Sequence, residues 1–522
     1  MPGPETAAVM EPSRPTARPG DTGRGAGFAP TSNAASLRGR RTVLLVGAAT
    51  AAVTATASWV PSLWGDEAAT VLSAERSLPS LWMMTQHLDA MHAVYYLLMH
   101  FWIGAFGASA FSVRFPSALA VGVGAAGLVV LLRMLGRGTK MAVLAAVLFE
   151  ALPRIQYIGQ ESRSFAWDAA LVTWTLIALV ATVQGRLPWR AGWTLYGASA
   201  AVSILLFPFD ASVVLMTAVL LFPATNRPLR TPWALSSASA VLAASPVLIL
   251  SFRERGQVAY LADTPVTPAQ ILVSTWFGDP AFAAAAWALL LVGLGGWVMR
   301  VLALRRAPAT GRTVHVSPLT LLAAWAFLPG AVLVLTQPFL HNYAERYIAF
   351  CAPAVGALMA EGITVLGRWK RAAGLIAAAC ILGVAIPTAI HQRTPFSENR
   401  SDWAQVAAFV HNRAQRGDDV LFAQTVSSSK RARNSLRLYP RDFAGLRDVA
   451  LTRPWYESAT TWHDQAMTIG EAATSGRVRS ATVWVVETCG SGSEGLSALR
   501  AQGYRAVSRR HFDLDTVYEL KR

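Results

Sequence analysis

Residues 42–60 read TVLLVGAATAAVTATASWV, and residues 61–67 continue the chain with PSLWGDE. The first run carries no charge and has nearly the length, about 20 residues, that an α-helix needs to cross a bilayer. Arg38, Arg40 and Arg41 stand directly before it, and basic residues mark the cytoplasmic end of a span. We therefore predict a first transmembrane helix with a cytoplasmic N-terminus, which puts Asp66 and Glu67 at the outer membrane surface.

Apolar runs of similar length recur along the chain. They occupy residues 113–132, 141–158, 165–183, 192–207, 209–224, 233–252, 281–299, 317–337, 347–366 and 372–390. In the whole chain 53% of the residues are hydrophobic and 15% are charged, whereas soluble chains have about 25% charged residues. We predict a polytopic α-helical membrane protein with about 11 transmembrane helices.

One further apolar segment, AVYYLLMHFWIGAFG at residues 93–107, is short for a span. A span at this point would reverse the side of every later loop and turn the Arg-rich loops outward, against the preference of basic residues for the cytoplasm. We therefore predict that residues 93–107 form a juxtamembrane helix on the outer face.

The formal net charge of +16 raises the question of a nucleic-acid partner. The placement of the basic residues favours another explanation. Of the 46 Lys and Arg residues, 20 lie in predicted cytoplasmic segments and seven in the outer loops before residue 392. Because this asymmetry is typical of a multi-pass plasma-membrane protein, we predict membrane lipid and no nucleic acid as its surroundings.

Composition divides the chain into three parts. Residues 1–41 are rich in Pro, Gly, Ala, Thr and Arg, which predicts a disordered cytoplasmic tail. Residues 42–391 form the predicted transmembrane domain. In residues 392–522, a helical pattern at 401–416 and apolar strands at 418–425 and 481–488 predict a small extracytoplasmic α/β domain.

Polar residues gather at the predicted outer ends of the spans in four motifs. The motifs are WGDE at 64–67, DAMHAVYY at 89–96, QYIGQESRSF at 156–165 and HNYAERY at 341–347. Ionisable residues at a membrane border are costly unless they are paired or solvated, and they are candidates for function. Their common side favours one shared site for a substrate with a phosphate at the interface and an apolar tail in the bilayer.

These motifs supply candidate residues for chemistry. A carboxylate of Asp66 or Glu67 can act as a general base on an acceptor hydroxyl, and planar guanidinium groups suit a phosphate. The predicted substrate-binding residues are His92, Tyr96, Gln160, Glu161, Arg163, His341 and Arg346. The alternatives are structural: ion pairs of Arg163 with Glu161 and of Arg346 with Glu345, and interfacial anchoring by His92 and the tyrosines.

The order of the motifs resembles that of the GT-C superfamily of integral-membrane glycosyltransferases, specifically the bacterial relatives of protein O-mannosyltransferases and the lipid A aminoarabinose transferase. The matching segments are WGDEAATVLSAERSL at 64–78, DAMHAVYYLLMHFW at 89–102, FGASAFSVRFPSALA at 106–120, IQYIGQESRSFAW at 155–167 and ERYIAFCAP at 345–353. The resemblance implies a GT-C fold and inverting transfer of a sugar, expected to be mannose. The donor would be a polyprenyl-phosphate sugar and the acceptor a hydroxyl of an envelope glycan, glycolipid or protein.

The resemblance also implies roles for single residues. Asp66 matches the acidic residue of the first outer loop, with Glu67 beside it, and would deprotonate or orient the acceptor hydroxyl. Arg163 and Arg346 match basic positions that would face the phosphate, whereas Arg114 is expected to be structural. The family's His-Pro-Pro is here His92-Ala93-Val94, so a role for His92 does not carry over directly. Some members use a divalent metal and others do not, and we expect no required metal or other cofactor.

Other functions stay open on the sequence. The enzyme could transfer another sugar, such as arabinofuranose. A transporter or flippase for a lipid-linked sugar is the alternative from another class. The charged candidates at the outer border and the lack of a visible inverted repeat disfavour transport.

The topology can be checked by cysteine labelling. Engineered cysteines in residues 133–140 are expected to resist a membrane-impermeant reagent added from outside, because this Arg-rich loop is predicted to be cytoplasmic. Efficient labelling there would reject the orientation.

Overall fold

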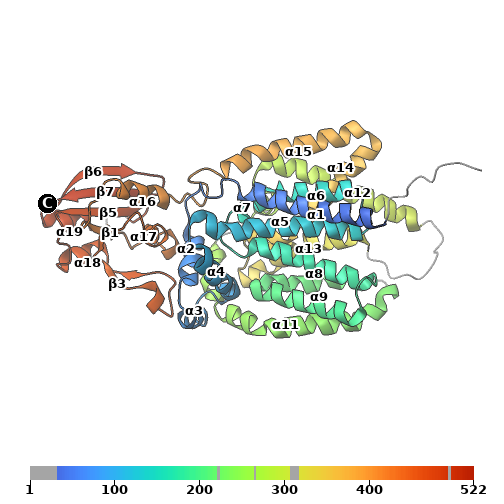
Figure 1. Ribbon diagram of the computed structural model, residues 1–522, viewed down its shortest axis with the longest axis horizontal. Coiled ribbons are helices and arrows are strands. Elements are labelled where there is room, and N and C mark those ends of the chain that lie inside the picture. The colour runs from blue at the N-terminus through green and yellow to red at the C-terminus, as the bar shows by residue number, and fades with distance from the viewer. Residues whose placement is uncertain (1–31, 220–223, 264–265, 306–316, 492–494) are drawn as a thin grey trace, which may run out of the picture. The chain divides into compact units, whose positions relative to one another are not determined.

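The computed structural model describes residues 32–219, 224–263, 266–305, 317–491 and 495–522 (Figure 1). Helices coincide with all eleven predicted apolar runs within these limits. The predicted tail lies largely outside the described residues, and helix α1 (Ser32–Ala55) begins before the apolar run does.

Seven helical segments in the described ranges are long and apolar enough to cross a membrane. They are α5 (Ala110–Met134), α8 (Phe165–Val183), α11 (Arg230–Arg253) with part of η4 (Ala224–Leu229), α12 (Pro280–Arg305), α13 (Pro318–Leu340), η7 (Glu345–Cys351) with α14 (Ala352–Trp369), and α15 (Arg371–His391). This confirms the polytopic helical fold class.

The other four predicted runs are also helical, and two of them are interrupted. They are represented by α1, by α6 (Thr139–Glu150) with α7 (Pro153–Ile158), by α9 (Trp189–Leu206), and by η2 (Pro208–Ala211) with α10 (Ser212–Ala218). The run 141–158, predicted as one span, is two helices. Pro153 opens the second of them, because its ring fits the first turn of a helix and not its interior.

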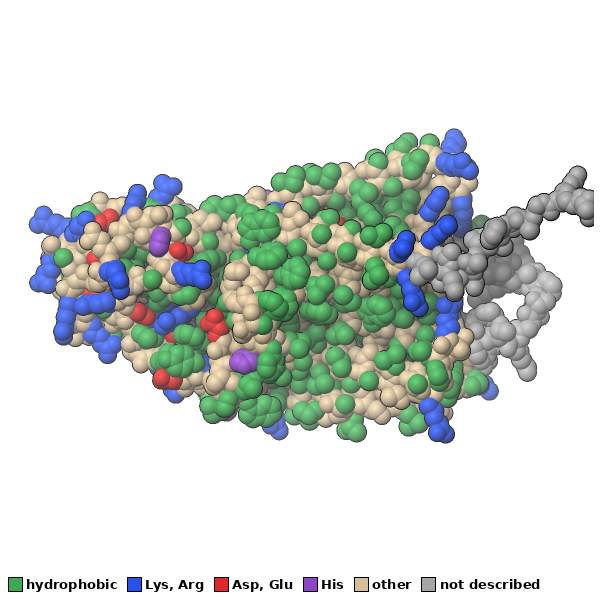
Figure 2. Space-filling view, viewed as in Figure 1, with side chains coloured by type: hydrophobic (Ala, Val, Ile, Leu, Met, Phe, Trp, Pro, Cys, Tyr) green, Lys and Arg blue, Asp and Glu red, His purple; other side chains and the backbone are tan. Residues whose placement is uncertain are grey.

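Figure 2 shows one face of the molecule, on which hydrophobic side chains cover the helices. Lys and Arg side chains gather on this face over the C-terminal strands and at helix ends. Leu242, Leu335, Phe339 and Leu375 are among the large apolar side chains that are more than half exposed. Such a broad apolar surface fits hydrocarbon rather than water, as in a multi-pass membrane protein.

Glycines allow close helix packing around α14. A Cβ on Gly362 would lie 2.1 Å from the carbonyl oxygen of Leu289 in α12, and one on Gly356 would lie 2.7 Å from the backbone nitrogen of Phe149 in α6. Small residues at such contacts let membrane helices pack backbone to backbone. The packing of α14 against its neighbours therefore fixes the direction in which Arg346, on the preceding η7, enters the site.

Short helices occupy the predicted outer region. They are α2 (Gly65–Ala74), α3 (Leu78–Thr85), η1 (Ala90–His92) and α4 (Ala93–Phe106). With 14 residues, α4 is about 21 Å long, less than the hydrocarbon thickness of about 30 Å. It packs against α2, α5 and α9. The predicted helix at 93–107 is thus present and too short to cross a bilayer.

The C-terminal region contains the predicted α/β fold. Its five-stranded sheet has the order β2-β1-β5-β7-β6, in which β2 (Arg447–Asp448), β1 (Asp419–Phe422) and β5 (Thr482–Thr488) are parallel. β7 (Asp515–Lys521) pairs antiparallel with both β5 and β6 (Arg505–His511). Helices α16 (Trp403–His411) and α17 (Asn434–Leu438) cover one core, and α18 (Ile469–Thr474) and α19 (Leu496–Ala501) cover the other.

Hydrogen bonds join this C-terminal region to helix α2. Arg76, just beyond the end of α2, is fully buried and donates to the carbonyl oxygens of Ser458 and Thr461, each at 2.6 Å. At the other end of α2, the backbone N–H of Leu63 donates to the hydroxyl of Tyr439 at 2.9 Å. Both ends of the helix that carries Asp66 are therefore held by the C-terminal region.

Candidate active site

The two carboxylates of the WGDE motif lie in the first turn of α2 and face different surroundings. Successive residues of an α-helix point about 100° apart. The Glu67 side chain is fully buried, whereas Asp66 is 18% exposed. The helix dipole favours negative charge in this turn, so both carboxylates are stabilised by the same helix end.

Glu67 forms a buried ion pair with Arg114 of α5. Nε and Nη2 of Arg114 donate to its two oxygens at 2.7 and 2.6 Å, and the N–H of Ser162 donates at 3.0 Å. Arg114 also donates to the carbonyl oxygens of Ser58 and Pro61 at 2.6 and 2.8 Å. With both oxygens bonded and no exposure, Glu67 does not fit the catalytic role predicted for it. Its geometry is structural, like that expected for Arg114.

Asp66 instead faces two arginines from distant segments. Its Oδ2 lies 2.8 Å from Nη1 of Arg346 and 3.5 Å from Nη2 of Arg163. The Arg346 guanidinium also lies over the rings of Trp64 and Phe165, 5.8 and 5.6 Å from their centroids. Burial would raise the pKa of Asp66, but Arg346 and Arg163 outweigh it and hold that pKa below its ordinary value. Asp66 is therefore ionised at neutral pH.

Arg163 extends this cluster toward the second motif. Its Nη1 donates to the hydroxyl of Tyr96 at 3.1 Å, and that hydroxyl donates to Oδ2 of Asp89 at 3.0 Å. The structure thus joins Asp66, Tyr96, Arg163 and Arg346. Asp89 was not among the predicted site residues; it lies just before η1 with a left-handed backbone, φ 57°, and the polar motif at 89–96 was the signal that could have included it.

Glu161 lies beside Arg346 and is completely buried. Its Oε1 is 3.9 Å from Nη1 of Arg346, and neither oxygen accepts a hydrogen bond from any described residue. Burial raises the pKa of Glu161 to about 7, with Arg346 lowering it and Asp66 raising it. Gln160, also buried, donates back to the carbonyl oxygen of Gln156 at 2.9 Å, a bond within the loop rather than to the cluster.

The alternative ion pairs considered on the sequence are replaced by others. Arg346 pairs with Asp66, and Glu345 lies 3.8 Å from Nη2 of Arg154 instead. Arg163 reaches Asp66 and Tyr96 rather than forming a close pair with Glu161. The two basic residues therefore converge on one carboxylate, Asp66.

The two histidines lie in different environments. His92 is buried and its ring is nearly parallel to that of Phe207, with centroids 6.2 Å apart. It also contacts the rings of Tyr96 and Phe165. His341 is exposed at the C-terminal cap of α13 with a φ of 48°. No contact joins it to the Asp66 cluster in the described part of the chain, so its role in substrate binding stays a prediction.

A cavity of about 260 Å³ lies next to the charged cluster along the chain. Its lining includes Met91, beside His92, and Tyr347, beside Arg346. The other lining residues are Pro208, Phe209, Leu248, Ser251, Phe252, Glu254, Arg255, Gln257, Leu340 and Asn342. Most of the lining is apolar, with a few polar groups, as is usual for a pocket that binds an amphipathic ligand.

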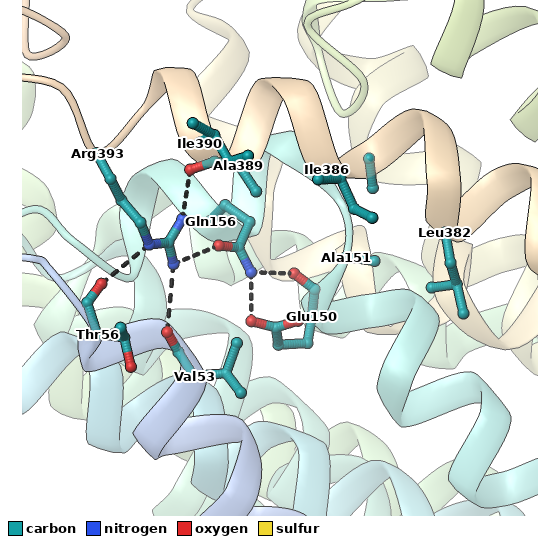
Figure 3. A pocket seen from close by; sticks show the side chains of 11 residues that line it. Val53, Thr56, Glu150, Ala151, Gln156, Leu382, Ile386, Ala389, Ile390 and Arg393 are labelled. Carbon is teal, nitrogen blue, oxygen red and sulfur yellow. Dashed lines mark hydrogen bonds between the residues drawn. The ribbon is translucent and has the colours of Figure 1, made fainter.

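A second cavity, of about 520 Å³, lies between α1, α15 and the junction of α6 and α7 (Figure 3). At its polar end Arg393 donates to the carbonyl oxygens of Thr56 and Ala389 at 2.9 and 2.8 Å. Arg393 also donates at 2.6 Å to Gln156, which in turn donates to Glu150. These bonds tie the start of the C-terminal region to α7, the helix that leads into the Glu161 loop.

The carboxylates of Asp66 and Glu67 form ion pairs with arginines. Among the described residues, no group of three or more His, Cys, Asp or Glu side chains could hold a metal. Glu67 is fully bonded by Arg114, and Asp66 is neutralised by Arg346 and Arg163. That no metal is required stays a prediction.

Part of the chain matches a known protein family, and its structure is similar to solved structures. Residues 93–250 match the family model described as dolichyl-phosphate-mannose-protein mannosyltransferase. A search of curated proteins gave no match. The structure is similar to that of ArnT from Cupriavidus metallidurans bound to undecaprenyl phosphate, with a TM-score of 0.52 and 13% identity over 91% of this chain and 97% of that one.

A second similar structure is the oligosaccharyltransferase of Archaeoglobus fulgidus in its apo form. The TM-score is 0.51 and the identity 11%, over 85% of this chain and 69% of that one. At such identities the likeness establishes the fold.

The structural role of Glu67 can be tested by substitution. Glu67→Gln is expected to lower the free energy of unfolding by about 3–5 kcal/mol, because Arg114 then stays charged and buried without its carboxylate partner. The thermal unfolding midpoint in detergent, followed by tryptophan fluorescence, measures the loss. As a control, Asp513→Asn removes a partner from Arg400, which is 66% exposed, and should leave the midpoint almost unchanged. Equal shifts for the two variants would contradict the assignment.

Proposed function

We propose that this protein, which has the fold of the GT-C superfamily, is a glycosyltransferase of the plasma membrane. It transfers a sugar from a polyprenyl-phosphate donor to a hydroxyl of an envelope glycan, glycolipid or protein. The observation that carries the proposal is the meeting of Asp66 with Arg163 and Arg346 beside an apolar cavity. That arrangement combines a base, two phosphate-binding groups and a place for a lipid.

The reaction assigns one task to each group. The acceptor O–H gives its proton to the Asp66 carboxylate, and its oxygen forms a bond to the anomeric carbon from the side opposite the phosphate. The bond between that carbon and the phosphate oxygen breaks, and polyprenyl phosphate leaves with the electron pair. Negative charge grows on the leaving phosphate, so Arg163 and Arg346, already in place, stabilise the transition state. The anomeric configuration is inverted.

Both arginines are paired with Asp66 in the structure. A donor phosphate carries the same negative charge as that carboxylate and presents two oxygens in a geometry that guanidinium groups bind well. Donor binding therefore competes with Asp66 for both arginines. The competition releases the Asp66 oxygen toward the acceptor at the moment when the donor is in position.

The cavity beside Tyr347 suits the first isoprene units of the donor. Met91, Phe209 and Phe252 give it an apolar surface, and burial of each CH₂ group contributes about 0.8 kcal/mol. The ring of Tyr347, which lines this cavity, contacts the ring of Phe165, over which the Arg346 guanidinium lies. We propose that the donor lipid occupies the cavity and that its phosphate lies at the arginines. Mannose is our proposed sugar, supported by the description of the family model that matches residues 93–250.

The proposed orientation follows from the same reaction. The N-terminus is cytoplasmic, and residues 392–522 form a domain outside the cytoplasm, on the side of Asp66. Envelope acceptors are then accessible to the site. No metal is required, because the arginines supply the positive charge that a cation would otherwise bring to the phosphate.

Asp66→Asn tests the base. The variant is expected to insert and fold, and its kcat with a polyprenyl-phosphate sugar should fall by about 10²-fold or more, because the amide cannot accept the acceptor proton. Turnover is measured by release of polyprenyl phosphate from purified protein. Asp442→Asn, in the C-terminal region, is the control and should retain wild-type turnover. Wild-type turnover of Asp66→Asn would reject the base, and loss of wild-type turnover after chelation of divalent cations would reject a metal-free reaction.

Arg163→Ala tests the phosphate contact. The variant should raise the KM for the donor by about 10- to 10²-fold, the cost of losing hydrogen bonds to a charged group, with little change for the acceptor. Steady-state kinetics with each substrate varied in turn gives both constants. Arg441→Ala, an exposed arginine of the C-terminal region, is the control. Equal losses for donor and acceptor would count against the phosphate role.

A further inference from the structure

One guanidinium nitrogen of Arg346 lies between two carboxylates. Its Nη1 is 2.8 Å from Oδ2 of Asp66 and 3.9 Å from Oε1 of Glu161. Glu161 is fully buried, and neither of its oxygens accepts a hydrogen bond from a described residue. A buried carboxylate is normally paired and hydrogen-bonded, whereas here Arg346 forms a close ion pair with Asp66 and only a long one with Glu161.

We propose that Glu161 is a positioning residue that takes over Arg346 when Asp66 releases it to act as a base. This inference rests on the proposed sugar transfer and adds a second state to its site. In the first state Arg346 is paired with Asp66. In the second state some N–H groups of Arg346 pair with ionised Glu161 and others face the donor phosphate, and Asp66 is free to accept the acceptor proton.

The exchange needs only a small movement. The distance from Nη1 to Glu161 exceeds the distance to Asp66 by 1.1 Å, which a change in side-chain torsions can supply. A charge-assisted pair is formed at about 2.7–2.9 Å. Arg346 keeps a carboxylate partner throughout, so no buried guanidinium charge is left unpaired during the reaction.

Electrostatics couples the exchange to proton transfer. Burial raises the pKa of Glu161 to about 7, and the negative charge of Asp66 contributes to the rise. When Asp66 takes the acceptor proton, that charge disappears and the pKa of Glu161 falls. Proton transfer to Asp66 therefore stabilises the pair of Arg346 with ionised Glu161 after that pair has formed. The charged and titratable groups that face Glu161 are Asp66, Glu67, Tyr95, Arg154, Tyr157, Arg163, Arg346 and Glu398.

The sign of the pH dependence follows. A carboxylate with a raised pKa loses its ionised form as the pH falls through that pKa. Because the second state requires ionised Glu161, kcat of the wild-type protein should fall as the pH falls below about 7. Asp66, with a lowered pKa, remains ionised over this range.

Glu161→Gln provides the kinetic test. Gln keeps the size of the side chain but cannot ionise, so kcat at about pH 8 should fall by about tenfold or more, and the decline of kcat below about pH 7 should disappear. Glu161→Asp keeps a carboxylate and should retain that decline. A Gln variant with wild-type kcat, or with a reduced kcat and the wild-type pH profile, would overturn the proposal, since a merely structural residue would leave the profile unchanged.

A spectroscopic test measures the ionisation of Glu161 directly. It needs no turnover, and either Glu161→Gln or Glu161→Asp can assign the signal. The infrared carbonyl band of a protonated carboxyl, assigned by its loss in Glu161→Gln or its displacement in Glu161→Asp, should titrate near pH 7 in the wild-type protein. In Asp66→Asn, Arg346 loses its first partner and pairs with Glu161, so the band should titrate at a lower pH. An unshifted titration would overturn the exchange even if the wild-type protein transfers sugar. A shifted titration in Asp66→Asn together with a wild-type protein that shows no sugar transfer would reject the proposed function and keep the carboxylate exchange.

Discussion

The buried ion pair between Glu67 and Arg114 is the constraint on which the site depends. It joins α2 to α5, and through Ser162 and the carbonyl oxygens of Ser58 and Pro61 it also fixes the loop before α8 and the turn before α2. A charge pair without exposure costs desolvation energy that only good geometry offsets. Here seven hydrogen bonds supply that geometry. The position of Asp66 follows, because it is the next residue on the same helical turn.

Two neighbouring acids thus serve different purposes. The helical turn directs Glu67 inward, where its charge is fully compensated, and Asp66 toward a partly open space lined by cations. The second arrangement is adaptable because two of its three ion pairs are long, Asp66 to Arg163 at 3.5 Å and Glu161 to Arg346 at 3.9 Å. The Glu67–Arg114 pair keeps the shape of the site. In the proposed exchange, Arg346 changes its partner from Asp66 to Glu161 within that shape.

The sequence was sufficient for features that depend on local pattern. Apolar runs located the helices, the short segment at 93–107 became α4, and alternating helices and strands gave the C-terminal sheet. The common side of the polar motifs also predicted that Asp66, Arg163 and Arg346 lie in one site. The sequence could not separate Asp66 from Glu67, because the partner of Glu67 is 47 residues away and is selected by tertiary packing. For the same reason the sequence could not show that His341 lies apart from the cluster, or that no described residue donates a hydrogen bond to Glu161.

The contacts of Arg76 have a consequence for the way the chain can be divided. Its buried guanidinium depends on the carbonyl oxygens of residues 458 and 461, which belong to the segment after the last membrane helix. A protein cut after α15 would lose these acceptors and expose the guanidinium, which would keep the hydroxyl of Ser80 as a partner. Residues 392–522 therefore pack directly against the membrane portion. Either part produced alone would expose the surface that the other part covers.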